Sequence, residues 1–409
     1  MNHQRRQVVC SLAYAGLFGK SVDAIASEMT SERIQPLATA WEQFGDHRTG
    51  TPAERQSALW LEKLLLIHGV PASTQVYSLQ RMSDPRAHIE VNGVVIDGFP
   101  LSDGGTTGGV DWDGKLVQVG EEGDFALIEV SPNAEYEPEF VKLRESGRYR
   151  AIVAITKGKT PGLALVNAAR HTRPAKVPVL QCPSTAAETL ALSARQGALV
   201  KLQVNFTRVP SEGTNVVATI AGSSGALPPL VIATPRSGWW RSTGERFGGI
   251  YCWLQALKAC AVARPDRTVI GVASSGHELG HLGMEDFERR NAGLAKSAFC
   301  WLHLGANIGA RGSQIGIQSS SADWMSLLDA ALSASSVPLR FKLGPGKKPF
   351  GEARNVFDAQ GSYLSLLASA GDFFHQSTDR GPDAIDFRTV DQVARVVGET
   401  ALRVCLSKT

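Results

Sequence analysis

The feature that most constrains the fold is a series of short strands, apolar on both faces and alternating with helical segments, that begins near residue 216. Such strands must be buried on both faces, because a strand with one face in water carries polar residues at every second position. Strands that alternate with helices form a parallel or mixed sheet covered by helices on both sides. We therefore expect an α/β fold with a mixed, mainly parallel sheet sandwiched by helices. The expected strands are 216–220, 230–233, 268–273 and 299–304, with a helix at 249–262.

Helices are also expected at both ends of the chain. Apolar residues recur at helical spacing over 31–44, and the segment 51–54, Thr-Pro-Ala-Glu, is a capping box with proline at the first helical position. The last helix is expected to begin at a second capping box, Thr-Val-Asp-Gln at 389–392.

Residues 85–206 have a different pattern of expected secondary structure from the rest of the chain. They contain short β-runs joined by turn-rich connections and two helices, with runs at 88–91, 115–119, 125–130, 151–155 and 199–204. We interpret them as a small β-rich domain inserted into a main domain formed by residues 31–84 and 207–409. Residues 1–30 are then an N-terminal extension.

Composition narrows the classes of partner. The chain has 409 residues, with 42 Lys and Arg against 39 Asp and Glu. This length supplies a large core, and the near balance of charge gives no reason to expect nucleic acid as a partner. The six cysteines form no CxxC pair, which argues against a zinc finger or a redox motif. No stretch reaches the roughly 20 uninterrupted apolar residues of a membrane span.

The extension admits two interpretations. Arg5 and Arg6 precede an apolar run at 8–18, and Ala-Ile-Ala at 24–26 resembles a cleavage site, which indicates a signal peptide of a periplasmic or secreted protein. Lys20 and Asp23 interrupt that region, which favours an amphipathic helix in a cytoplasmic protein. We expect a cytoplasmic protein, with export as the alternative.

Candidate site residues follow the expected strands, where functional groups collect in such sheets. The segment 235–246 after the strand 230–233 is rich in arginine and tryptophan, and His-Glu-Leu-Gly-His at 277–281 follows the strand 268–273. His303 lies within a strand, and Asp-Phe-Phe-His at 372–375 follows a strand-like run at 363–367.

This order of segments resembles the M28 family of zinc aminopeptidases with a PA-type (protease-associated) inserted domain. Asn-Val-Val-Ala-Thr-Ile at 215–220, Gly-His-Glu-Leu-Gly at 276–280 and Phe-His-Gln-Ser-Thr-Asp at 374–379 carry the resemblance. It implies a zinc-exopeptidase-like fold, and in active members two zinc ions that share a bridging carboxylate. A homodimer is also common on this scaffold.

The resemblance keeps only two metal-ligand positions unchanged, Glu278 and His375. The remaining positions of the family's site fall on Pro235, Ser237, Gly244 beside Glu245, His277 in place of the general-base glutamate, and His303. Two dications close together need a bridging carboxylate, which glycine does not provide, so we do not expect a dinuclear site. A single zinc on Glu278, His303 and His375 stays open as the alternative to no cofactor.

Two other catalytic schemes have weaker support. The sequence 277–281 matches the H-E-x-x-H motif of zincins, but it follows a strand directly and Gly280 weakens any helix there. A nucleophilic Ser237 or Ser275 beside His277 also stays open, although the chain has no G-x-S-x-G elbow.

Three arginines lie in the loop that, by the resemblance, donates zinc ligands, and His277 and His303 stand in place of a glutamate and an aspartate of the family's site. A guanidinium is a permanent cation that stabilises developing negative charge or binds a substrate carboxylate, and the indoles of this loop stack on flat groups. His277 is then the base and Glu278 its orienting partner, with His303 and His375 beside them. Glu352, Arg354 and Asp372 are further candidates at the rim. The expected substrate-binding residues are Arg236, Ser237, Trp239, Trp240, Arg241, Glu245 and Arg246.

We therefore expect a hydrolase that cleaves an amide or related carbonyl bond in a small anionic or aromatic substrate, or a short peptide-like one, without a dinuclear metal centre. Two alternatives stay open: a non-catalytic M28-like binding protein and a mononuclear zinc aminopeptidase.

Overall fold

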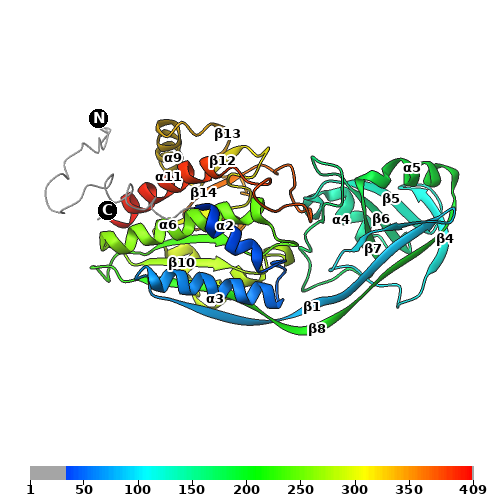
Figure 1. The fold of residues 1–409 in the computed structure, drawn as a ribbon, viewed down its shortest axis with the longest axis horizontal. Helices are drawn as coiled ribbons and strands as arrows, with labels where there is room; N and C mark the ends of the chain where they lie inside the picture. The colour runs from blue at the N-terminus through cyan, green and yellow to red at the C-terminus, as the bar shows by residue number, and fades with distance from the viewer. Residues whose placement is uncertain (1–33, 408–409) are drawn as a thin grey trace, which may run out of the picture.

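The computed structural model describes residues 34–407, and the expectations for the N-terminal extension lie outside them. Figure 1 shows two bodies joined by two long paired strands, β1 (Ala72–Val91) and β8 (Leu199–Ile220). These strands pair antiparallel from Ala72 opposite Ala218 to Val91 opposite Val200. The expected short strands 88–91, 199–204 and 216–220 are thus parts of two continuous strands, because a bulge at 83–86 bends the ladder without ending it.

The larger body contains the expected mixed sheet, which confirms the fold class. Its strands run in the order β13-β12-β14-β11-β9-β10-β8, with β1 on the outer edge of β8. The pairs β10/β9, β9/β11, β11/β14 and β12/β13 are parallel, and the others are antiparallel. The remaining strands are β9 (Leu230–Pro235), β10 (Val269–Ser274), β11 (Cys300–Leu304), β12 (Ile315–Ser319), β13 (Leu339–Leu343) and β14 (Tyr363–Ala368).

Helices cover both faces of this sheet. One face packs on α2 (Ile34–Gln43), α3 (Pro52–Ile67), α6 (Gly248–Ala263), α9 (Ala322–Ala334) and α11 (Phe387–Cys405) around a core that includes Trp41 and Trp253. The other face packs on α7 (Leu282–Arg290), α8 (Leu294–Ser297) and α10 (Ala353–Asp358) around Phe287 and Trp301. None of the helices in residues 34–407 has the length and apolar character to cross a membrane.

The two capping boxes have different outcomes. Thr51 caps α3 as expected, and its side chain accepts a hydrogen bond from the Glu54 amide at 3.2 Å. The second expectation is wrong: α11 begins at Phe387, and the Asp386 side chain accepts bonds from the amides of Arg388 and Thr389. An aspartate three residues upstream satisfies the same orphan amides, so Thr389 lies inside the first turn.

The smaller body has cores of its own around Phe125 and Phe140. Its strands β4, β5, β6 and β7 are parallel neighbours in that order. At the edges, β2 pairs with β1 and β3 pairs with β7, and two α-helices flank the strands. The bounds are β2 (Val94–Asp97), β3 (Phe99–Pro100), β4 (Trp112–Gln118), β5 (Phe125–Val130), α4 (Pro138–Glu145), β6 (Ala151–Thr156), β7 (Val179–Pro183) and α5 (Ala187–Gln196). That this body is a PA-type domain stays a prediction.

Candidate active site

The candidate site lies at the carboxyl ends of β9, β10 and β11, which are parallel neighbours and therefore deliver their following segments to one edge of the sheet. Segment 235–247 follows β9, the turn η5 (His277–Leu279) follows β10, and His303 lies in β11. The last contributor, His375, comes from the segment after β14.

His277 is paired with Glu352, not with its sequence neighbour Glu278. Its Nδ1 lies 3.2 Å from Glu352 Oε1, and the second oxygen of Glu352 accepts the Ser274 hydroxyl at 2.6 Å. A carboxylate only accepts hydrogen bonds, so the ring donates from Nδ1 and carries its lone pair on Nε2. Burial, and then the Arg246 guanidinium, hold the pKa of His277 well below its ordinary value of 6.5. The ring is therefore neutral at neutral pH, which is the form that a base requires.

Both oxygens of Glu278 are held by hydrogen bonds within the protein. Its Oε1 accepts the amide and the hydroxyl of Thr49, both at 2.7 Å, and its Oε2 accepts the Ser237 hydroxyl at 2.6 Å. Ser237 Oγ in turn accepts the amides of Gly276 and His277. Because this hydroxyl donates to Glu278, it makes no bond to the His277 ring, which removes the support for Ser237 as a nucleophile.

Arg246, Glu245 and His375 form a buried ionic group. Glu245 Oε1 lies 2.7 Å from Arg246 Nη2 and 3.2 Å from His375 Nε2, and all three residues are no more than 2% exposed. Burial raises the pKa of Glu245, but the two cations outweigh it and bring the pKa to about 2. Burial likewise lowers the pKa of His375, but Glu245 outweighs it and the net pKa is raised. Glu245 is therefore an anion.

A π-helical turn, η4 (Thr243–Phe247), places these two residues. The Asp379 carboxyl holds the turn by accepting the amides of Gly244 at 2.7 Å and of Glu245 at 3.0 Å. A Cβ on Gly244 would lie 2.6 Å from Ala384 O and 2.7 Å from Asp379 Oδ1. The position that the resemblance assigns to a bridging aspartate therefore has no room for a side chain. Burial, and then Glu245, raise the pKa of Asp379 to about 7.

His303 completes the group. Its Nδ1 lies 2.8 Å from Ser365 Oγ, and its buried Nε2 has no hydrogen-bond partner among the described residues. Burial lowers the pKa of His303 to about 4, so the ring is neutral. His303, His277 and Arg246 are close enough for each charge to affect the others.

The smaller body covers the site. The Leu165 carbonyl lies 2.6 Å from His375 Nδ1, and the Ala168 amide donates to the Glu278 carbonyl at 2.8 Å. Asn167 accepts the Trp239 indole N–H at 3.1 Å and donates to Glu135 at 3.1 Å. Burial raises the pKa of Glu135 to about 7, although the charge of His375 opposes it.

The three arginines of the segment 235–246 lie in different environments. Arg236 is completely buried in an ion pair with Glu54 on α3, whereas Arg241 is half-exposed and lies 3.8 Å from Glu42 on α2. Of the three, only Arg246 contributes to the lowered pKa of His277 and of His303. The two tryptophans contact the cover: Trp239 donates to Asn167, and Trp240 packs on Phe99 of β3 at 5.8 Å between ring centroids. Trp240 also donates to the His375 carbonyl at 3.0 Å.

The donors present do not fit a zinc ion. A ligand must direct a lone pair at the ion, but the Glu278 carboxylate already accepts three hydrogen bonds within the protein and both ring nitrogens of His375 face oxygen atoms. Arg246 adds a fixed cation beside the same carboxylate. Within residues 34–407, no three His, Cys, Asp or Glu side chains are grouped as a metal site requires.

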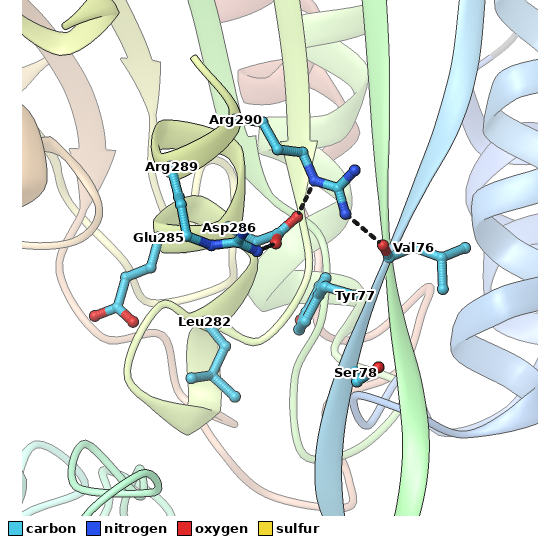
Figure 2. Close-up of a pocket in the computed structure, with 8 residues that line it drawn as sticks. All are labelled: Val76, Tyr77, Ser78, Leu282, Glu285, Asp286, Arg289 and Arg290. Atoms are coloured by element: carbon cyan, nitrogen blue, oxygen red, sulfur yellow. Dashed lines mark hydrogen bonds and ion pairs between the residues drawn. The ribbon is translucent and has the colours of Figure 1, made fainter. Parts of the chain in front are cut away.

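An open groove lies between β1 and α7, with a volume of about 510 Å³ (Figure 2). Two acids line it, Glu285 and Asp286, and Asp286 is paired with Arg289 and Arg290. Arg290 also donates to the Val76 carbonyl at 2.7 Å. The Tyr77 ring separates the groove from the turn after β10, since a Cβ on Gly276 would lie 2.7 Å from the Tyr77 hydroxyl. The charged groups of the groove are thus distinct from the buried site.

Sequence reasoning missed several site residues because they reach the site from distant segments. Thr49 and Glu54 come from the N-terminal helical region, Asp379 ends the segment 374–379 in which only His375 was expected in the site, and Glu135 and Asn167 belong to the smaller body. Glu352 was expected only as a rim candidate. The capping box at 51–54 contains Glu54 and was a usable signal, but it predicts a helix start and not a buried ion pair.

This arrangement of sheet, helices and inserted strands is the fold of the M28-type zinc aminopeptidases. The zinc aminopeptidase BSAP from Bacillus subtilis is similar at 14% identity with a TM-score of 0.71, over 95% of each chain. The Peptidase M28 precursor from Shewanella amazonensis SB2B is similar at 15% identity with a TM-score of 0.71, over 95% of this chain and 96% of that one. The aminopeptidase from Aneurinibacillus sp. strain AM-1 is similar at 14% identity with a TM-score of 0.70, over 93% and 95%. By sequence, the chain matches no family model and no curated protein.

Proposed function

We propose that the protein is a hydrolase that cleaves an amide or related carbonyl bond of a small substrate, with side chains in the place of metal ions. The observation that carries the proposal is the His277–Glu352 pair beside the Arg246 guanidinium, at the sheet edge where this fold places its active site. The pair supplies a base, and the guanidinium supplies a fixed positive charge.

The chemistry follows from these two groups. His277 Nε2 takes a proton from water as the water oxygen bonds to the carbonyl carbon, and the carbonyl π-electrons move to oxygen. Arg246 stabilises that oxyanion. The imidazolium, held by Glu352, then gives its proton to the leaving nitrogen as the C–N bond breaks, which yields a carboxylic acid and an amine and restores neutral His277.

The test is hydrolysis of N-acyl amino acids and aminoacyl anilides by the purified protein, with and without a chelator. We expect turnover, and we expect 5 mM EDTA to change its rate by no more than about twofold, because the free ligands that a structural or catalytic zinc needs are missing. Saturating zinc should also leave the melting temperature unchanged, since only a ligand that binds the native state raises it. Chelator-sensitive turnover, or about one zinc per chain by elemental analysis, would contradict the proposal.

The pH dependence of kcat/KM is a separate prediction. The base is the neutral form of His277, and its pKa lies well below 6.5. Activity is therefore expected to stay level as the pH falls from about 8 to about 6, and to decline only below the ordinary histidine range. Removing the positive charge in Arg246→Met should move this decline to higher pH, whereas Arg246→Lys should leave it in place. An acid limb centred at or above 6.5 in the wild type would argue against His277 as the base.

A binding protein without catalysis is the second candidate, and the cover over the site favours it. Glu278 and His375 are bound to backbone groups of the smaller body and are no more than 2% exposed. His277 retains 11% of its side-chain exposure, so a ligand approaches the group there. Tight binding of a small ligand with no turnover would select this candidate.

A further inference from the structure

Arg246 keeps donors that no protein group uses. A guanidinium has five N–H donors. Its Nε–H donates to the Ser237 carbonyl at 2.6 Å, and Nη2 faces Glu245 Oε1 at 2.7 Å. This leaves three of the five, and neither Nη1 nor Nη2 makes a hydrogen bond of good geometry to the described residues. Arg246 is 1% exposed, so water outside the protein does not serve these donors. Unused donors of a buried cation carry a substantial desolvation cost, which an acceptor removes.

His303 presents another donor, and its neighbours fix which nitrogen carries the proton. Gln318 Nε2 donates to Ser365 Oγ at 3.2 Å, which leaves the Ser365 hydroxyl hydrogen in need of an acceptor. Among the described residues, His303 Nδ1, at 2.8 Å, is the one acceptor in hydrogen-bond contact with that hydroxyl. Nδ1 is therefore the acceptor, and the proton lies on Nε2. That Nε2–H is buried and has no acceptor among residues 34–407.

We infer that the unused N–H groups of Arg246 and His303 form a binding site for the carboxylate of a small organic acid, so that the substrate of the proposed hydrolase is an N-acyl amino acid or a similar amide-bearing acid. That the bound acid is a substrate rests on the proposed function, but the carboxylate site rests on these donors alone. The planar fork of a guanidinium matches the two oxygens of a carboxylate. Glu245 offsets the charge of Arg246 but leaves these N–H groups free, so it does not replace the ligand.

Gly351 packs closely against the His303 ring. A Cβ at residue 351 would lie 3.0 Å from His303 Cε1 and 3.5 Å from Nε2, and the backbone there has a φ of +67°. Both the conformation and the close approach favour glycine. Its neighbour Glu352 orients His277, so the same turn brings the base and the carboxylate site together.

The test compares N-acetylphenylalanine with N-acetylphenylalaninamide, which differ only in the carboxylate, by calorimetric titration. We expect the acid to bind the wild-type protein at least about tenfold more tightly, because a charge-assisted pair replaces a neutral contact. Arg246→Met should reduce this ratio to within about twofold, whereas Arg241→Met, on the same segment but half-exposed, should retain it. Equal binding of acid and amide to the wild type would overturn the inference without any variant, so a poorly folding Arg246→Met does not affect the decision.

Hydrolysis of the same two compounds separates this inference from the proposed function. Preference for the acid without turnover would overturn the hydrolase and retain the carboxylate site. Turnover without preference for the acid would retain the hydrolase and overturn the carboxylate site.

Discussion

Replacing His277 by alanine is expected to lower kcat/KM by about 10²- to 10⁴-fold, the range that a positioned general base contributes. The physical reason is that no other described side chain near Arg246 has a neutral imidazole lone pair with a carboxylate on its opposite nitrogen. His303 is also neutral, but its lone pair faces Ser365. Initial rates with the best substrate of the N-acyl amino acid series measure the effect.

Two matched variants show whether the loss is catalytic. Glu352→Gln retains the shape of the partner and removes its charge, so it should lower kcat while leaving KM within about twofold, since orientation of the base matters in the transition state. His281→Phe should have a much smaller effect, because His281 stacks on His277 at 4.8 Å between ring centroids but makes its own bond to Asn355. Full activity in His277→Ala would end the proposed mechanism.

The comparison of His277 with Glu278 shows why the fold was predictable and the site was only partly so. A helix start depends on residues that are close in sequence, such as Thr51 and Glu54. A buried strand likewise depends on a short run of apolar residues, and such runs predicted the sheet. The direction of a side chain in a tight turn depends on what lies around it. Adjacent residues of η5 point apart, so that Glu278 reaches Thr49 and His277 reaches Glu352, 75 positions away.

The roles of the three arginines in the segment 235–246 were unpredictable for the same reason. The sequence places three arginines there and predicts one shared role, but each arginine has a different acid beside it, and two of these acids come from other segments. Glu54 on α3 takes Arg236, Glu42 on α2 lies beside Arg241, and Glu245 holds Arg246. Long-range packing thus decides which cation is available, and composition does not contain that information.

Replacing Arg236 by methionine is expected to have the largest effect on stability, a loss of about 3 to 5 kcal/mol in the free energy of unfolding, because it leaves a buried acid without its partner. Arg236 and Glu54 are both completely buried, and Arg236 also donates to the Glu54 carbonyl at 2.9 Å and to Ser57 at 3.1 Å. Denaturant unfolding or the melting temperature measures the loss. The control Arg241→Met removes a half-exposed partner and should cost no more than about 1 kcal/mol.

The sign of the pH dependence tests the cause of that loss. Burial raises the pKa of Glu54 above its ordinary 4.5 even though Arg236 lowers it, so removing Arg236 should raise the pKa further. A carboxyl whose pKa is higher in the folded state than in the unfolded state loses stability as the pH rises through that interval. The penalty of Arg236→Met should therefore grow from pH 5 to pH 8, and the double variant Arg236→Met/Glu54→Leu should recover most of it, because an apolar pair of similar volume leaves no buried charge. A penalty independent of pH, or one that the second substitution does not relieve, would assign the loss to packing and not to the ion pair.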